Sequence, residues 1–309
     1  MTAGLALALG RAFIAACRDE LQALKPGNVH VFADGHRMTV ADFERSAEAA
    51  AGPLSRSGAR TGLRILEAVR ATQAAAGQNT NLGIVLLCAP LARAAEAGED
   101  LRSSLKTVLA DLDREDAANA FEAIRLASPA GLGAAARHDV REPAAATLRE
   151  AMAEAAPRDR IARAYADGFS EVFDLGLPAL TAASGAGPRW WPAAAAYLAF
   201  LRVAPDSHVS RKFGDGVANA LREETEAWLG GLAPVAEERA LTAYLADFDR
   251  SLKERGLNPG TCADLTVATL FVARLHDVLR ERQENGSLRP GEAGASLLSG
   301  QPVRRLAGC

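Results

Sequence analysis

Apolar residues recur at helical spacing along most of the chain. Between residues 159 and 173, Ile161, Tyr165, Phe169 and Phe173 lie four positions apart, with charged residues between them. Side chains four residues apart share one face of an α-helix, so this pattern predicts an amphipathic helix. The same spacing predicts helices over 60–76, 82–97, 101–112, 115–127, 144–156, 192–203, 215–229, 235–255 and 262–283. No segment alternates in the way a strand does, and the sequence therefore predicts an all-α protein.

The composition favours the same fold class. Alanine dominates the chain, and aromatic residues make up only 5% of it. Alanine loses no side-chain entropy in a helix, so an alanine-rich chain favours helices. The 49% of hydrophobic and 24% of charged residues are typical of a globular protein with a large core. Because no linker divides the chain, we expect one compact domain over residues 1–285 and a flexible tail over 286–309.

Charge and cysteine content narrow the class of protein. The 35 Lys and Arg residues nearly balance the 38 Asp and Glu residues, and the net charge of −3 comes without a basic cluster. This balance excludes a general nucleic-acid-binding protein. The four cysteines show no paired spacing, which is typical of buried thiols in a reducing compartment. The apolar run 5–16 has no basic leader, so we interpret it as a core helix and expect a cytoplasmic protein without a membrane segment.

Five breaks between the predicted helices are unusually polar. They cover residues 25–30, 77–83, 128–140, 205–212 and 258–264. In the second break Asn79, Thr80 and Asn81 follow one another, although one such side chain is enough to cap a helix. An all-α protein presents its backbone donors and reactive side chains at helix ends. The surplus of carboxamide and hydroxyl groups therefore predicts hydrogen bonding to a sugar or a base.

The break 258–264 allows two interpretations. Thr261 and Asp264 have the spacing of a capping box, which would make the segment an ordinary helix start. Alternatively, the helix start at Gly260 offers free N–H groups to a phosphate, while Asp264 holds a magnesium ion. The local pattern alone leaves both interpretations open.

Two other breaks also combine structural and functional signals. Asp206 and His208 suit metal binding or proton transfer, and Arg211 and Lys212 suit phosphate binding. A solvated helix cap would give the same pattern. In the break 128–140, two glycines precede the pair His138-Asp139, which suits close approach to a ligand but also a plain connecting turn.

Taken together, these segments resemble the triphosphoribosyl-dephospho-coenzyme A synthase family. The matching segments are Lys25-Pro26-Gly27-Asn28-Val29-His30, Asn79-Thr80-Asn81-Leu82-Gly83, Ala123-Ile124-Arg125-Leu126-Ala127-Ser128-Pro129 with His138-Asp139-Val140, Pro205-Asp206-Ser207-His208, and Asn258-Pro259-Gly260-Thr261-Cys262-Ala263-Asp264-Leu265. Each motif is short, and the specificity lies in their joint occurrence, in the family's order, over residues 20–280. The resemblance implies an all-α fold.

The resemblance also implies a reaction. Characterised family members transfer the triphosphoribosyl part of ATP to the 2′-hydroxyl of 3′-dephospho-coenzyme A and release adenine. Substitution at an anomeric carbon passes through an oxocarbenium-like transition state, which needs carboxylates near the sugar, a base for the acceptor hydroxyl and cations for the triphosphate. ATP is the implied substrate and Mg²⁺ the implied cofactor. The expected partners are a nucleotide and a ribosyl acceptor, and both monomer and homodimer remain open.

The implied chemistry assigns roles to residues of the polar breaks and to one carboxylate before them. The expected catalytic residues are Glu20, His138 and Asp139, and the expected magnesium ligands are Asp206 and Asp264. The expected contacts to nucleotide and phosphate come from Lys25, Asn28, His30, Asn79, Asn81, His208, Arg211, Lys212, Asn258, Gly260 and Thr261.

The sequence departs from characterised family members in two of the matching segments. They carry a basic His-Lys pair where this chain has Asn81-Leu82, and a Gly-Ala-Arg-Gly-Glu type segment where this chain ends its loop in Arg137-His138-Asp139-Val140. This pattern resembles the branch found in archaea and in bacteria with archaeal-type one-carbon cofactors. A second prediction is therefore ribosyl or phosphoribosyl transfer in the synthesis of a tetrahydromethanopterin-like cofactor. A third interpretation is a non-catalytic helical interaction protein. Such a protein would have an exposed apolar face instead of polar helix ends.

Overall fold

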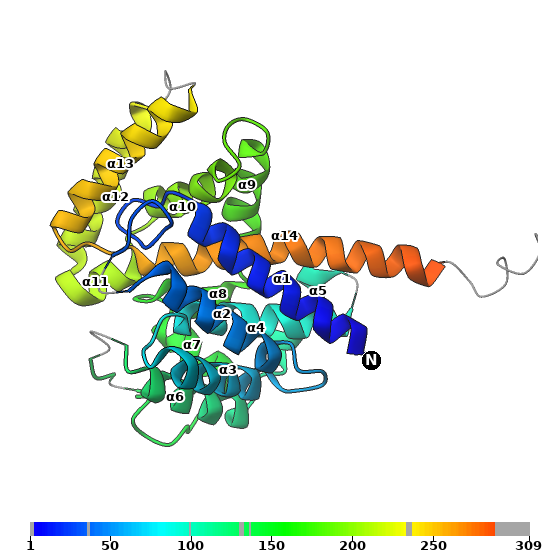
Figure 1. Ribbon diagram of the computed structural model, residues 1–309. Coiled ribbons are helices and arrows are strands. Elements are labelled where there is room, and N and C mark those ends of the chain that lie inside the picture. Colours follow the sequence, from blue (N-terminus) through cyan, green and yellow to red (C-terminus); the bar gives the residue numbers. More distant parts are fainter. Residues whose placement is uncertain are drawn as a thin grey trace, which may run out of the picture.

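The computed structural model describes residues 3–35, 38–98, 100–129, 133–135, 137–232 and 237–287 (Figure 1). Within these residues the chain forms fourteen α-helices, one π-helix and no strand beyond two isolated bridges, so the all-α prediction is confirmed. The elements are α1 (Ala3–Gln22), α2 (Val40–Leu54), α3 (Thr61–Ala76), α4 (Leu82–Ala97), α5 (Leu101–Ala110), α6 (Arg114–Ala127), α7 (Leu148–Ala155), α8 (Arg160–Asp167), the π-helix η1 (Glu171–Gly176), α9 (Leu177–Ala183), α10 (Trp191–Val203), α11 (Ser207–Phe213), α12 (Asp215–Gly230), α13 (Glu238–Glu254) and α14 (Gly260–Ser287).

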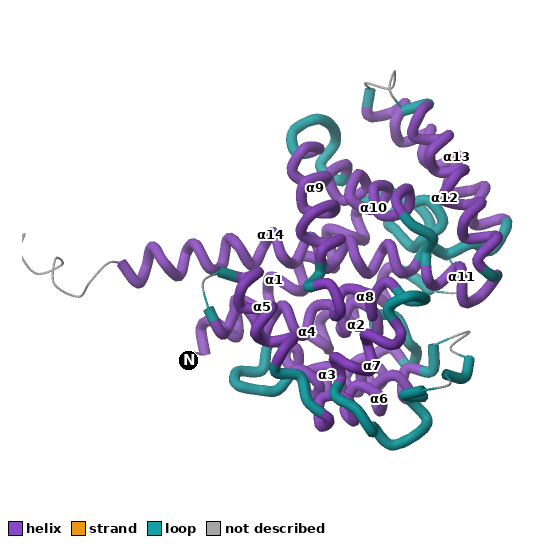
Figure 2. Tube along the Cα trace, turned by 180° about the vertical axis from the view of Figure 1, so that it is seen from behind, coloured by secondary structure: helices purple, strands orange, loops and turns teal. Residues whose placement is uncertain are grey.

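Helix α14 is the central element of the fold. It packs against α1, α4, α10 and η1, and Figures 1 and 2 show it crossing the body of the molecule and extending beyond it at its C-terminal end. Leu265, Ala268, Val272 and Leu275 recur at steps of three and four residues and are fully buried. Such a stripe on one helix face is what places α14 in the core.

Two groups of helices pack on opposite sides of α1 and α14 (Figure 1). On one side α2 packs against α3 and α3 against α6, and on the other α12 packs against both α10 and α11. Small buried residues such as Ala50, Ala68, Ala117 and Ala120 let the helices of the first group approach closely. The polar loops meet between the two groups.

Most helix boundaries follow the sequence pattern, but the pattern did not predict α2, α9 and α11, and one predicted helix is interrupted. The predicted helix 82–97 coincides with α4, but the predicted helix over 159–173 is two elements. Helix α8 ends at Asp167, where Gly168 (φ 73°) and Phe169 (φ 62°) take up left-handed conformations, and η1 follows. Phe169 and Phe173 are nevertheless both buried. The hydrophobic spacing therefore reported burial correctly, although the helix is interrupted.

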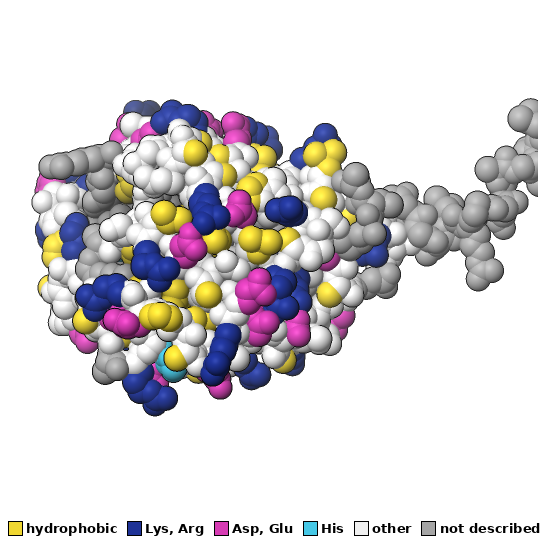
Figure 3. Space-filling view, turned by 90° about the horizontal axis from the view of Figure 1, so that it is seen from below, with side chains coloured by type: hydrophobic (Ala, Val, Ile, Leu, Met, Phe, Trp, Pro, Cys, Tyr) yellow, Lys and Arg dark blue, Asp and Glu magenta, His cyan; other side chains and the backbone are white. Residues whose placement is uncertain are grey.

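Membrane spans, cysteines, the C-terminal boundary and surface charge were also predicted from the sequence. None of the described helices is both long and apolar enough to cross a bilayer. Cys17, Cys88 and Cys262 are buried free thiols, as expected, whereas Cys309 lies outside the described residues. Helix α14 continues two residues past the predicted boundary at 285, and the rest of the predicted tail is outside the described part. The face seen in Figure 3 carries basic and acidic side chains intermixed, without a continuous basic surface.

Candidate active site

A cavity of about 710 Å³ lies where the polar loops meet, and each of the five polar segments contributes to its wall. Twelve of the sixteen predicted site residues line it: Glu20, Asn28, Asn79, His138, Asp139, His208, Arg211, Lys212, Asn258, Gly260, Thr261 and Asp264. The other four, Lys25, His30, Asn81 and Asp206, lie outside its lining. The fold thus brings together segments from both ends of the chain.

Lys25 lies behind the cavity wall and supports two residues that line it. Its ammonium pairs with the Glu20 carboxylate and donates to Asn28 Oδ1 at 3.0 Å and to the Val29 carbonyl oxygen at 2.7 Å. A lysine ammonium has three N–H donors, so all of them are used within the protein. Burial raises the pKa of Glu20 and lowers the pKa of Lys25. Lys25 therefore positions Glu20 and Asn28 and has no donor left for a phosphate.

A carboxamide pair joins two distant segments in the cavity wall. Asn28 Nδ2 donates to Asn258 Oδ1 at 2.7 Å, and both residues line the cavity. The neighbouring Gly27 makes this contact sterically feasible, because it has a positive φ of +83° and a Cβ atom there would lie 2.9 Å from the Leu257 carbonyl oxygen. The Gly27 N–H donates to Asp249 Oδ1 at 2.8 Å and holds the turn in place.

His30 is a buried structural histidine in this arrangement. Its Nε2 lies 3.3 Å from Asp249 Oδ1, and the ring does not line the cavity. Burial lowers the pKa of His30 despite the neighbouring carboxylate of Asp249. The ring is therefore neutral at pH 7 and supports the loop rather than contacting a nucleotide.

Asn79, Thr80 and Asn81 divide their tasks at the start of α4. Asn79 lines the cavity, and its Oδ1 accepts a hydrogen bond from the Leu82 N–H at 3.2 Å. Thr80 Oγ1 donates to Ser46 Oγ at 2.6 Å, and Asn81 Nδ2 donates to the Ser46 carbonyl oxygen at 3.4 Å. The predicted polar surplus is thus used largely to pack α4 against α2, and of the three residues Asn79 and Thr80 also line the cavity.

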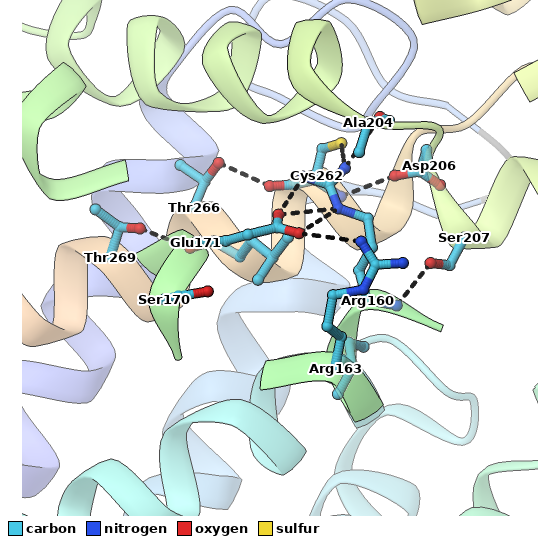
Figure 4. Close-up of polar contacts among 12 residues, drawn as sticks. Arg160, Arg163, Ser170, Glu171, Ala204, Asp206, Ser207, Cys262, Thr266 and Thr269 are labelled. Atoms are coloured by element: carbon cyan, nitrogen blue, oxygen red, sulfur yellow. Dashed lines mark hydrogen bonds and ion pairs between the residues drawn. The ribbon is translucent and has the colours of Figure 1, made fainter. Parts of the chain in front are cut away.

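Asp206 is fully buried and joins the starts of two helices (Figure 4). Its Oδ1 accepts hydrogen bonds from the His208 and Val209 N–H groups at 2.8 and 3.0 Å, and its Oδ2 accepts one from the Cys262 N–H at 2.8 Å. The carboxylate therefore caps α11 and the first turn of α14. The capping box of Thr261 and Asp264 does not form. We expected the free N–H groups of this helix start to meet a phosphate, and one of them, the Cys262 N–H, donates to Asp206 instead.

Arg160 underlies the same junction, as Figure 4 shows. Its buried guanidinium pairs with Glu171 and donates to the Ala204 carbonyl oxygen and to Cys262 Sγ, each at 3.3 Å. Its backbone N–H donates to Ser207 Oγ at 2.9 Å. These contacts join α8, η1, α11 and α14. Arg160 is one of the charged residues between the apolar positions of the predicted helix 159–173. The sequence pattern therefore gave no sign of this buried role.

His138 and Asp139 both line the cavity, but they are not a hydrogen-bonded pair. Asp139 accepts hydrogen bonds from the Arg141 guanidinium at 2.6 and 2.8 Å and from the Ala135 N–H at 2.8 Å. The Arg141 side chain, followed by the backbone N–H groups of Arg141 and Ala135, lowers the pKa of Asp139. Such a carboxylate is a weak base, and it does not orient His138.

Asp264 is distinct from the other predicted carboxylates in the cavity wall. Glu20 pairs with Lys25 and Asp139 with Arg141, whereas Asp264 accepts no hydrogen bond or ion pair from the part of the chain that the structure describes. Burial, followed by the charges of Asp206 and Glu20, raises the pKa of Asp264 well above its ordinary value. A carboxyl group in this setting favours its protonated form unless a cation is bound beside it.

The two predicted magnesium ligands are consequently not equivalent. Among the described residues, no group of three or more His, Cys, Asp or Glu side chains is arranged to hold a metal ion. Asp206 does not fit a metal site, because both of its oxygens accept backbone hydrogen bonds. Mg²⁺ commonly uses one or two protein carboxylates together with substrate phosphates. Asp264 fits that mode, in which the metal arrives with a nucleotide.

The cavity also has an apolar part and further basic groups that the sequence pattern did not reveal. The apolar wall comes from α4, α6, α7 and α8 and includes Leu82, Leu86, Phe121, Ile124, Met152, Ala155 and Ile161. Arg137 and Arg158 add basic side chains to Arg211 and Lys212. An apolar side chain facing an internal cavity has the same spacing as one in the core, so periodicity cannot separate the two.

Comparison with known proteins agrees with this arrangement. The sequence profile of the ATP:dephospho-CoA triphosphoribosyl transferase family matches residues 6–283, which include all five polar segments. A crystal structure from Archaeoglobus fulgidus, provisionally named a triphosphoribosyl-dephospho-CoA synthase, matches with a TM-score of 0.57 and 25% sequence identity, over 75% of this chain and 96% of that chain. The profile match extends from α1 into α14, and on this ground the chain belongs to the ATP:dephospho-CoA triphosphoribosyl transferase family.

Proposed function

We propose that this protein transfers the triphosphoribosyl part of ATP to the 2′-hydroxyl of 3′-dephospho-coenzyme A and releases adenine. The observation that carries the proposal is the convergence of the five family segments on one cavity. Its wall combines basic side chains, carboxamides and an apolar part. These three kinds of surface match the phosphates, the sugar hydroxyls and the base of a nucleotide.

In this proposal the triphosphate contacts Lys212, Arg158 and Arg211. All three line the cavity, and Arg211 is oriented by an ion pair of 2.5 Å with Asp159. Asp264 would hold, on the protein side, a Mg²⁺ ion that accompanies ATP. Such an ion would supply positive charge that offsets the triphosphate.

The sugar contacts and the proton acceptor come from other residues of the wall. Asn28, Asn258 and Asn79 offer carboxamide groups for ribose hydroxyls. We assign proton abstraction from the acceptor hydroxyl to Glu20, because its carboxylate lines the cavity and burial raises its pKa above the ordinary value, which makes it a stronger base. Lys25 holds that carboxylate in place. His138 is the alternative base.

The test is direct. Purified protein is incubated with ATP, Mg²⁺ and 3′-dephospho-coenzyme A, and mass spectrometry follows free adenine and the triphosphoribosyl product. We expect both to accumulate together, and neither when the acceptor is omitted. Glu20→Gln should abolish turnover, whereas His138→Gln should retain it. The reverse result would transfer the base role to His138, and absence of both products with the wild-type protein would refute the proposal.

One feature of the cavity wall favours a different acceptor. Where characterised relatives carry a basic pair, this chain has Asn81, which is bonded to Ser46, and Leu82, which lines the cavity. The site therefore presents less positive charge at this position. The alternative function is ribosyl or phosphoribosyl transfer to a pterin-type acceptor. Faster adenine release with that acceptor than with 3′-dephospho-coenzyme A would favour it.

A further inference from the structure

We infer that Gly83 is a positioning residue for Asp264, because the missing side chain at position 83 provides the space in which the Asp264 carboxylate lies. The inference rests on the proposed function only for its catalytic consequence. Its structural part concerns the contact between the first turn of α4 and the first turns of α14, two helices that pack directly on one another.

The space at Gly83 is filled by two side chains of the cavity wall. A Cβ atom built on Gly83 would overlap Oδ2 of Asp264, would lie 2.5 Å from its Cγ and would lie 2.8 Å from Ile161 Cδ1. Real Cβ atoms essentially never approach other heavy atoms within 3.0 Å, so an alanine must displace a neighbour. Among the glycines that the structure describes, Gly83 is the one whose Cβ would meet a carboxylate group of the cavity wall.

The backbone gives no separate reason for glycine at this position. Gly83 is the second residue of α4 and lacks a positive φ. Alanine is more favourable than glycine inside a helix, so the helix alone would favour alanine. Packing against Asp264 and Ile161 is therefore the constraint that glycine satisfies here.

The backbone of Asp264 cannot easily move away from a larger residue at position 83. The start of α14 is held by the hydrogen bond from the Cys262 N–H to Asp206, and Leu265 beside it is fully buried. The backbone of this turn is thus fixed, and a clash must rotate the carboxylate. No hydrogen bond from the described residues holds that carboxylate in its rotamer, so its position depends on the shape of the wall.

A double-mutant cycle tests the inference. The variants are Gly83→Ala, Asp264→Ala and the double variant, with Gly52→Ala as the matched control. Gly52 also lies in a helix, but a methyl group added there would meet nothing within 4 Å. The readouts are the urea midpoint of unfolding, calorimetric affinity for Mg–ATP and kcat for adenine release. The unfolding midpoint is independent of the proposed function, whereas the affinity and kcat depend on it.

We expect Gly83→Ala to lower the unfolding midpoint, Mg–ATP affinity and kcat, the last two by tenfold or more. In the Asp264→Ala background the same substitution should cost little in any readout. Gly52→Ala should leave affinity and kcat at the wild-type values and should not lower the unfolding midpoint. Wild-type affinity and kcat in Gly83→Ala, or losses that multiply in the double variant, would overturn the inference. If Gly83→Ala fails to fold, recovery of folded protein in the double variant supports the inference, and continued failure overturns it. Suppose that the two substitutions shift the unfolding midpoint non-additively while the wild-type protein shows no turnover. That result would reject the proposed function and retain the positioning role of Gly83.

Discussion

Asp206 accepts a hydrogen bond from the backbone N–H of Cys262 at 2.8 Å, although the two residues are 56 positions apart. The other oxygen of the same carboxylate caps α11. One buried side chain thus sets the relative placement of two helix starts, and both contribute residues to the cavity wall. In this family member, the predicted metal ligand Asp206 directs both of its oxygens at backbone donors.

Asp206→Asn should separate the structural role from a metal role. The amide keeps one acceptor oxygen, so one of the two helix starts loses its cap. We expect the free energy of unfolding in urea to fall by about 1–2 kcal/mol, the usual value of a helix cap. Asp100→Asn, at the exposed cap of α5, is the control and should cost less. Unchanged stability combined with loss of Mg-dependent ATP binding would instead restore Asp206 as a metal ligand.

Lys25→Met should destabilise the protein through its partner. Glu20 would remain buried without its cation, and breaking a buried ion pair on one side typically costs about 3–5 kcal/mol. The double variant Lys25→Met with Glu20→Gln should recover much of that loss, because the remaining side chain is neutral. Chemical denaturation measures both. A variant Lys25→Met that keeps full stability but binds ATP weakly would place Lys25 at the phosphates.

His30 should make the stability depend on pH below neutrality. Burial lowers its pKa in the folded state, whereas the unfolded chain titrates near the ordinary value of about 6.5. Below that pH the unfolded state binds a proton that the folded state excludes, so stability falls as the pH falls, by at most about 1.4 kcal/mol per pH unit. His30→Gln should flatten this slope between pH 7 and 5. The exposed His276 provides the control, and a slope that disappears in His276→Gln but not in His30→Gln would contradict the prediction.

Lys212→Ala should weaken nucleotide binding without affecting the fold. Lys212 is exposed at the cavity, and a charge-assisted phosphate contact is worth about 1.5–3 kcal/mol, or roughly ten- to a hundredfold in affinity. Calorimetric titration of Mg–ATP at low and high salt measures the change. Lys106→Ala, on the exposed face of α5 and outside the cavity lining, should leave the affinity unchanged. Equal effects of the two substitutions would show a general charge effect and no phosphate contact.

Much of the fold could be predicted because helical periodicity reports which positions are buried. The spacing over 82–97 predicted α4 residue for residue, and the polar breaks marked all five segments that meet at the cavity. Periodicity failed at α2, whose buried face consists of small residues such as Ser46, Ala47 and Ala50. Alanine and serine give little contrast between a buried and an exposed face, so no stripe was visible there.

The sequence by itself determined the fold class, the family and the set of polar segments, because these depend on local spacing and on residue type. Tertiary structure decided which members of those segments face the cavity. Asp206 and Asp264 are the same residue type in neighbouring motifs, yet one caps two helices and the other lies against Gly83 without a partner among the described residues. The role of a carboxylate depends on the donors and the space that distant segments bring to it, and spacing along the chain does not encode either.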